Sequence, residues 1–128
     1  MKKLLILILF LKSNAIADIN LSKIEDGLNK PWSISIIDKG KYLITEKPGN
    51  IILFNEKDGT TKKINHDLNL LEDGQGGLLD VFYKDSYVYV TYSENISKGT
   101  TSTSISKAKF NKNKLKFKNI FRSIPPIK

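Results

Sequence analysis

The sequence predicts an all-β fold of two consecutive four-stranded units, because it contains an internal repeat, regularly spaced turn residues and no helical periodicity. Residues 35–45 superpose on residues 81–91 at an offset of 46 positions, and each run has the pattern of a strand, a short polar turn and a second strand. No segment after residue 17 repeats its apolar residues at helical spacing over a useful length. The two copies therefore predict two hairpins of the same kind.

Each hairpin is followed by two further strand candidates. In the first unit, about residues 30–65, these are residues 51–54 and 61–64, with Lys57-Asp58-Gly59 as the turn between them. In the second unit, about residues 76–123, they are residues 103–110 and 115–121, joined by Asn111-Lys112-Asn113. Gly, Asn and Asp tolerate the left-handed backbone angles that tight turns require. The expected total is eight strands.

A repeat of roughly 40 to 50 residues with four strands is typical of β-propeller blades. A single eight-stranded sandwich has the same number of strands, but it does not require its two halves to resemble each other. Two blades cannot close a ring, and apolar strand residues such as Ile34, Ile36 and Val88 need further protein on either side. We therefore expect the first two blades of an incomplete ring.

Residues 1–17 have the pattern of a secretory signal peptide. Lys2 and Lys3 precede an unbroken apolar run from Leu4 to Leu11, and Ala15-Ile16-Ala17 matches the small-x-small cleavage pattern. The apolar run is shorter than the roughly 20 residues that a membrane-spanning helix needs. We expect a mature chain that begins near Asp18, is periplasmic or secreted, and has no transmembrane segment after cleavage.

Composition excludes several kinds of site and partner. The chain has no cysteine, so disulfides, thiolate nucleophiles and sulfur metal ligands are absent. Its net charge of +8 is uneven, since residues 98–128 carry eight lysines and Arg122 but no acidic residue. Nucleic acid is not the expected partner, because aromatic residues for base stacking are not interleaved with the lysines. Lysines that protect a solvated strand edge account better for the basic tail.

A single glutamine framed by glycines, Gly74-Gln75-Gly76-Gly77, is the main candidate binding feature. Glycine permits unusual backbone angles and close approach of other groups, so the Gln75 side chain is expected to be presented rather than buried. Blade geometry places this loop on the same face as residues 30–32, 45–50 and 92–99, at the mouth of the central axis. The alternative is a plain turn without a binding role.

The same face carries a family resemblance that runs in order along almost the whole chain after residue 17. The segments are NKPWSI (29–34), LITEKPGNI (43–51), GQGGLLDV (74–81), VYVTYSE (88–94) and IFR (120–122). They resemble the opening of the soluble quinoprotein sugar dehydrogenases of the glucose/sorbosone dehydrogenase family. The resemblance implies an exported six-bladed propeller that binds pyrroloquinoline quinone (PQQ) and calcium. It also implies oxidation of an aldose at its anomeric carbon to a lactone, with electrons passed to an external acceptor.

The resemblance gives Gln75 a place beside the quinone and the sugar, where an amide can both donate and accept hydrogen bonds. Glu46 is a weaker candidate for the same pocket, with an exposed ion pair to Lys47 or a turn-stabilising role as the alternative. Trp32, a large aromatic beside an inner strand, is expected in the core, with a place at the border of the pocket as the alternative. Asp80 is expected to be structural, bonding to the backbone of the neighbouring blade.

No catalytic residue and no metal ligand is assigned within this chain. The family's general-base histidine, its cofactor-binding cations and its calcium ligands correspond to later blades. The single histidine, His66, lies in a polar connection and is expected to have a surface or loop-tethering role and not a catalytic one. Without a base, these residues alone are expected to be inactive.

Three functions remain open from the sequence. The first is the N-terminal part of an exported quinone-dependent aldose dehydrogenase. The second is a non-catalytic secreted propeller module that binds carbohydrate or protein. The third is a calcium-dependent propeller hydrolase that opens lactones.

Overall fold

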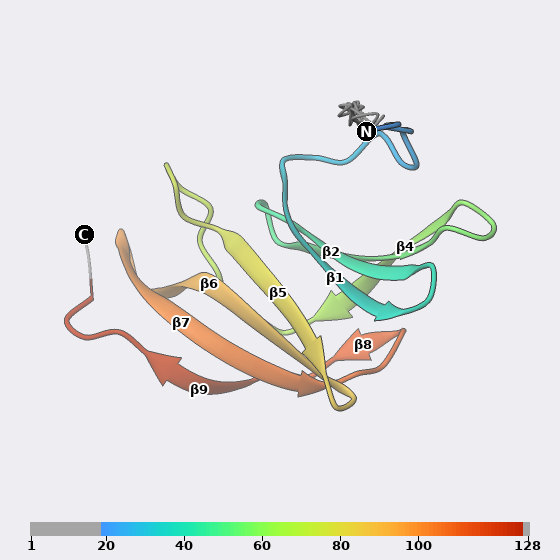
Figure 1. Ribbon diagram of the computed structural model, residues 1–128. Coiled ribbons are helices and arrows are strands. Elements are labelled where there is room, and N and C mark those ends of the chain that lie inside the picture. The colour runs from blue at the N-terminus through green and yellow to red at the C-terminus, as the bar shows by residue number, and fades with distance from the viewer. Residues whose placement is uncertain (1–18, 127–128) are drawn as a thin grey trace, which may run out of the picture.

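The computed structural model describes residues 19–126, which form nine β-strands and no helix (Figure 1). The all-β prediction is therefore confirmed for this part of the chain. The expected signal peptide, residues 1–17, lies outside the described residues. Within residues 19–126 there is also no helix of the length and apolar character that crossing a membrane requires.

The strands form two antiparallel sheets, each built mainly of strands in sequence order. The first sheet contains β1 (Pro31–Asp38), β2 (Lys41–Glu46), β3 (Asn50–Asn55) and β4 (Thr60–His66). The second contains β5 (Leu78–Lys84), β6 (Tyr87–Ser97), β7 (Thr100–Lys109) and β9 (Lys118–Arg122). The short β8 (Lys114–Leu115) joins the edge of the first sheet beside β4.

The predicted repeat is visible as the hairpins β1–β2 and β5–β6. Asp38 pairs with Lys41 in the first hairpin, and Lys84 pairs with Tyr87 in the second. Both turns use left-handed backbone angles, with φ of 68° at Gly40 and of 50° and 65° at Asp85 and Ser86. Local turn chemistry thus produces the same element twice.

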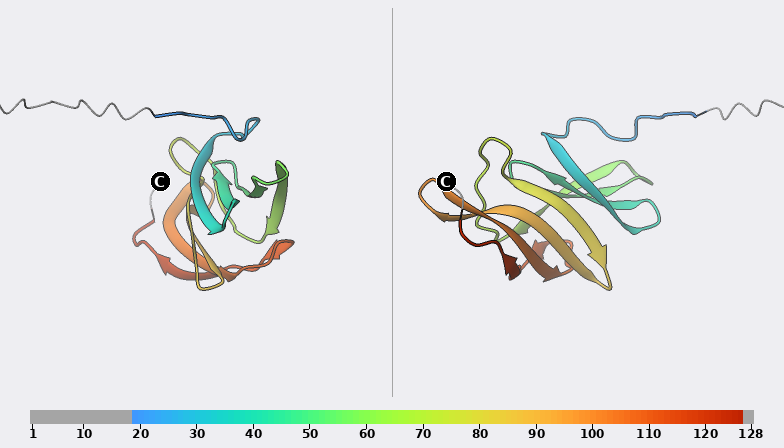
Figure 2. Two further views of the ribbon diagram at one scale, coloured as in Figure 1. Left: turned by 45° about the vertical axis from the view of Figure 1, so that its right-hand side comes forward. Right: turned by 60° about the vertical axis from the view of Figure 1, so that its left-hand side comes forward.

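The first strands of the two sheets lie side by side. The Ser35 hydroxyl on β1 accepts a hydrogen bond of 2.9 Å from the Tyr83 backbone N–H on β5. Asp80 on β5 accepts a hydrogen bond from the Ser33 hydroxyl, so it bonds to the neighbouring sheet through a side chain and not through the backbone group expected from the sequence. Figure 2 shows the two sheets from further directions. Consecutive antiparallel strands in each sheet are the topology of propeller blades, whereas a sandwich of the immunoglobulin type needs Greek-key connections.

The main core lies between the two sheets. Each sheet contributes the side chains of one face, and the members of this cluster are at most 4% exposed: Leu43, Ile51, Ile64, Leu78, Val81, Val88, Val90, Tyr92, Ala108 and Leu115. A smaller cluster of Ile44, Ile52 and Phe54 lies on the other face of the first sheet, where Leu28 packs against it. Burial on both faces explains the unbroken apolar run of residues 51–54 in β3.

The expectation of one strand over residues 115–121 is wrong. Leu115 belongs to β8, which pairs in parallel with β4 through His66, and only from Lys118 does the chain pair with β7. Leu115 is fully buried in the core between the sheets. The two residues of β8 therefore pair with the first sheet and not with the second, because Leu115 is buried in the core there. The apolar periodicity of the local sequence does not show this change of sheet.

One face of β1 remains open in the described part of the chain. Trp32, Ile34 and Ile36 alternate along the strand and are 48%, 57% and 68% exposed. The expectation that Trp32 lies in the core is wrong here, because its face of β1 points away from the packed sheets. The exposed Ile34 and Ile36 agree with the expectation that their face needs further protein, whereas Val88, also named in that expectation, is already fully buried between the two sheets.

Candidate functional site

Gln75 lies at the tip of a tight turn between β4 and β5. The Gly76 N–H donates a 2.6 Å hydrogen bond to the Asp73 carbonyl, which closes the turn. Gly74 has a φ of 50°, in the left-handed region that glycine adopts at little cost. The Gln75 side chain is exposed, so its amide is available to a ligand.

The turn borders a hollow of about 440 Å³. Its wall comes from the Gln75 turn and from three strands of the second sheet: Leu71, Asp73, Gln75, Gly76, Leu79, Ser93, Gly99, Thr101 and Thr103. Thr101 and Thr103 alternate along β7 with Ser102 and Ser104, which are buried toward the first sheet. The hollow therefore lies on the face of the second sheet that points away from the first.

The segment before Gln75 is attached to the end of β6. The Leu71 N–H donates to the Ser93 carbonyl at 3.0 Å, and the Ser93 N–H donates to the Gly77 carbonyl at 2.8 Å. Asn95 and Asn69 are also joined, by a backbone hydrogen bond of 3.0 Å. These bonds bring together the glutamine loop and the residues after Tyr92, as the blade geometry predicted.

Glu46 is buried at the end of β2, with 3% of its surface exposed. Its two carboxylate oxygens accept hydrogen bonds of 2.6 Å, one from the Asn29 backbone N–H and one from the Asn50 side-chain amide. Glu46 lines a smaller hollow beside the N-terminal segment and not the one at Gln75. Its carboxylate thus fixes the start of β1 and the turn between β2 and β3.

His66 at the end of β4 tethers the same turn from the other side. Its Nε2 lies 2.6 Å from the Gly49 carbonyl oxygen, and its Nδ1 accepts a 3.3 Å hydrogen bond from the Leu68 N–H. This pattern requires the neutral ring with its proton on Nε2. Both ring nitrogens have backbone partners, which is the loop-tethering role predicted from the sequence.

An acidic side chain near the hollow holds three strands of the second sheet together. Glu94 on β6 accepts hydrogen bonds from Ser104 on β7 at 2.6 Å and from Asn119 on β9 at 3.1 Å, and it forms a bidentate pair with Arg122. The Arg122 hydrogen bond is the largest cause that lowers the pKa of Glu94 below its usual value. This carboxylate is therefore a structural anion.

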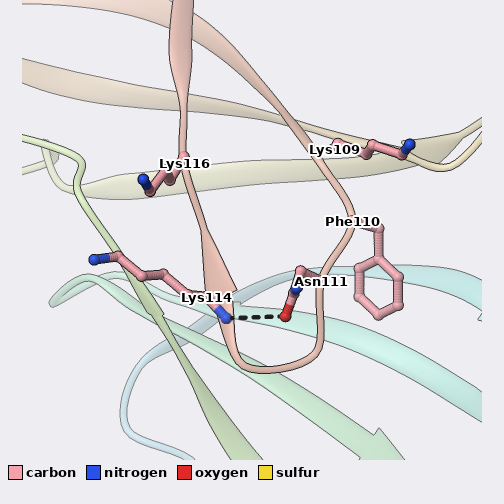
Figure 3. Close-up of a pocket in the computed structure, with 5 residues that line it drawn as sticks. All are labelled: Lys109, Phe110, Asn111, Lys114 and Lys116. Atoms are coloured by element: carbon pink, nitrogen blue, oxygen red, sulfur yellow. Dashed lines mark hydrogen bonds between the residues drawn. The ribbon is translucent and has the colours of Figure 1, made fainter.

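A second hollow of similar volume lies far from Gln75 in the sequence, at the connection from β7 through β8 (Figure 3). It is lined by Lys109, Phe110, Asn111, Lys114 and Lys116. The Lys109 ammonium points to one side, whereas those of Lys114 and Lys116 point to the other (Figure 3). The three cations do not converge on a common point, so this hollow has weaker features of a binding site than the hollow at Gln75.

Comparison with known proteins gives this arrangement a family. The family model described as Glucose / Sorbosone dehydrogenase matches residues 28–128. The chain belongs to the glucose/sorbosone dehydrogenase family. The resemblance recognised from the sequence motifs is confirmed.

Individual relatives of the family cover most of this chain. The curated aldose sugar dehydrogenase YliI of Escherichia coli strain K12 is 26% identical over 120 residues, which are 87% of this chain and 32% of the relative. A solved glucose dehydrogenase is 31% identical with a TM-score of 0.76, over 81% of this chain and 35% of the other. The PQQ-bound aldose sugar dehydrogenase of Streptomyces coelicolor shares the fold, with 22% identity and a TM-score of 0.71, over 82% of this chain and 34% of the other.

The chain thus spans about a third of the length of these relatives. Their propeller-type fold supports the assignment of the two sheets as adjacent blades. Residues 19–126 contain no group of three or more His, Asp or Glu side chains close enough to hold a metal ion. The part of the family fold that this chain represents is therefore two adjacent blades, which include the residues around the Gln75 hollow.

The sequence did not single out the wall that β7 contributes to the hollow. Residues 100–104 are all Ser or Thr, so polarity alone does not show which side chains face the core. Alternation from the buried Ala108 would have placed Thr101 and Thr103 on the outward face, because successive strand residues point to opposite sides.

Proposed function

We propose that this chain is the N-terminal part of an exported quinoprotein oxidoreductase. The whole protein would oxidise an aldose at its anomeric carbon to a lactone, using PQQ with calcium, and pass the electrons to an external acceptor in the periplasm or outside the cell. The proposal depends on one observation above all: the exposed Gln75 amide at the border of a hollow, on a chain of this family.

The residues around the hollow suit a polar, oxygen-rich ligand. Gln75 supplies an amide that donates and accepts, and Ser93, Thr101 and Thr103 supply hydroxyl groups. Leu71 and Leu79 add apolar contact area for a planar or ring-shaped group. A PQQ-bound structure is known for the Streptomyces coelicolor relative. This chemistry fits quinone carbonyl oxygens and sugar hydroxyls.

The described residues do not supply every group that the cofactor needs. The hollow is lined by the carboxylate of Asp73 and by no lysine or arginine, so partners for the carboxylates of PQQ would come from outside residues 19–126. Calcium ligands would likewise come from elsewhere in the protein. When bound, PQQ accepts the hydride from the sugar carbon.

Gln75 would orient the ligand by hydrogen bonding. Glu46 would contribute indirectly, because its hydrogen bond with Asn50 fixes the turn between β2 and β3. The blade limits, residues 30–65 and 76–123, and the signal peptide, residues 1–17, are part of the same proposal. Residues 19–126 would be inactive by themselves, because the general-base histidine that the family resemblance implies corresponds to later blades.

The test uses the full-length protein supplied with PQQ and Ca²⁺, with dye reduction followed for a panel of aldoses. Gln75→Leu is expected to lower kcat/KM roughly five- to ten-fold, since one uncharged hydrogen bond contributes about 1 kcal/mol. Asn65→Leu, an exposed amide replacement on β4, is the matched control and should leave kcat/KM unchanged. Absence of dye reduction with every aldose would reject the enzyme, and sugar binding without reduction would favour the non-catalytic module.

A further inference from the structure

The turn that follows β2 contacts the Gln75 loop on both sides of the glutamine. The Lys47 carbonyl accepts a 2.9 Å hydrogen bond from the Leu78 N–H. The Lys47 ammonium donates a hydrogen bond to the Gly74 carbonyl. One residue of the first sheet therefore holds the loop immediately before Gln75 and again three residues after it.

The contact between the two loops is close. A Cβ atom added at Gly77 would lie 2.4 Å from the Lys47 carbonyl oxygen and 2.8 Å from its Cγ. The Lys47 N–H in turn donates a 3.0 Å hydrogen bond to the Lys30 carbonyl. The Lys30 ammonium lies 2.7 Å from a carboxylate oxygen of Glu72, at the start of the same loop.

The three contacts differ in how far they depend on side-chain identity. The bond to Leu78 is between backbone groups, so it persists with almost any residue at position 47. The pair of Lys30 and Glu72 is largely exposed, with side-chain exposures of 61% and 29%, and such pairs are weak and screened by salt. The bond from the Lys47 ammonium to the carbonyl of the exposed Gly74 is the one contact of the three that depends on the side chain at position 47.

We propose that Lys47 is a positioning residue for Gln75, because its ammonium fixes the turn that presents the amide to the hollow. Lys30 gives secondary support through Glu72. The role in ligand binding depends on the function proposed above, whereas the ordering of the loop does not.

The physical consequence is preorganisation. With the ammonium in place, the turn is held at Gly74 and at Leu78, and a ligand meets an amide that is already oriented. Without it, the loop keeps its backbone hydrogen bonds at Leu71, Gly77 and Leu78 but loses the one at Gly74, and binding has to restrict the amide at that moment. Such a loss weakens the ground state and the transition state alike, so it raises KM and leaves kcat nearly unchanged.

The test compares Lys47→Met, which keeps the apolar stem, with Lys47→Arg, which restores a cationic donor. Amide hydrogen exchange of the full-length protein is the first measurement. Lys47→Met should speed exchange of the Gly76 N–H at least about five-fold, as expected when a local opening becomes easier. Exchange at the core residues Val88 and Val90 should not change, and Lys47→Arg should recover at least half of the protection.

The second measurement is steady-state kinetics on the same variants. Lys47→Met is expected to raise KM for the aldose about five-fold while kcat stays within about two-fold. Lys57→Met, in the exposed turn between β3 and β4, is the matched control and should alter neither exchange nor KM. Lys30→Met should show a smaller effect that disappears at high salt.

Each outcome decides between the two proposals. Unchanged exchange at Gly76 in Lys47→Met would overturn the positioning role, and so would a uniform increase that includes the core. A lowered kcat with unchanged KM would also contradict it. Faster exchange confined to the loop, in a protein that reduces no dye, would support the ordering role and reject the dehydrogenase.

Discussion

Replacement of Gly77 by alanine tests how closely the two blades meet at the candidate site. Gly77 is buried and has a φ of 144°, which L-residues rarely adopt. The added methyl group would lie 2.4 Å from the Lys47 carbonyl oxygen, which is the acceptor for the Leu78 N–H. The backbone of one loop must move, and the hydrogen bond between Lys47 and Leu78 is then weakened or lost.

The expected cost is the sum of two effects. An unfavourable backbone conformation costs about 1–3 kcal/mol, and the weakened hydrogen bond adds about 1 kcal/mol. Gly77→Ala should therefore lower the free energy of unfolding by about 2–4 kcal/mol. Urea unfolding, followed by circular dichroism on the full chain, should show a midpoint lower by roughly 1–2 M.

Gly74→Ala is the matched control in the same loop. Gly74 also has a positive φ, of 50°, but its added Cβ would have no atom within 4 Å. It should cost about 1 kcal/mol, because only the left-handed conformation is penalised. If the two variants were destabilised equally, within about 0.5 kcal/mol, close contact between the blades would not be what restricts Gly77.

Two further predictions concern the core and the acidic network. Leu115→Ala should lower the free energy of unfolding by about 2–5 kcal/mol, because Leu115 is fully buried between the sheets. Leu21→Ala, at a side chain that is 93% exposed, is the control. A similar loss of stability in both variants would contradict the placement of β8. The lowered pKa of Glu94 stabilises the fold above the usual carboxyl value of 4.5, and this contribution is lost as pH falls through the lowered value. Arg122→Met should therefore destabilise the protein at pH 7 and raise the pKa of Glu94, so that acid unfolding begins at a higher pH. Unfolding curves measured from pH 7 to pH 2 should converge at the acid end, and a difference that persisted there would exclude the ionised pair as its cause.

Turn chemistry and apolar periodicity carried most of the fold prediction. Both signals act over a few residues, so the hairpins at Gly40 and at Asp85-Ser86 were predicted from their own segments. A contact of Asp80 with the neighbouring sheet was also expected, although its partner is the Ser33 hydroxyl and not a backbone group. These features depend on short stretches of chain or on the blade architecture itself.

The roles of charged residues at the site were harder to predict. Glu46 and Lys47 are adjacent in the sequence, yet Glu46 is buried against Asn29 and Asn50, whereas Lys47 reaches Gly74 in the next blade. Successive side chains diverge at the end of a strand, and their partners lie between 4 and 27 residues away along the chain. Sequence spacing does not state which loop is near enough to bond.

The sequence by itself determined the all-β class, the repeated hairpin, the glycine-framed amide and the family, since these depend on local backbone preferences and on residue patterns. Only the tertiary structure decided that Leu115 pairs with the first sheet, that both carboxylate oxygens of Glu46 accept structural hydrogen bonds, and that β7 forms a wall of the hollow. Those outcomes depend on which surfaces meet when the two sheets pack. Residues that are far apart along the chain can then lie close together in space, and sequence separation does not show which ones do.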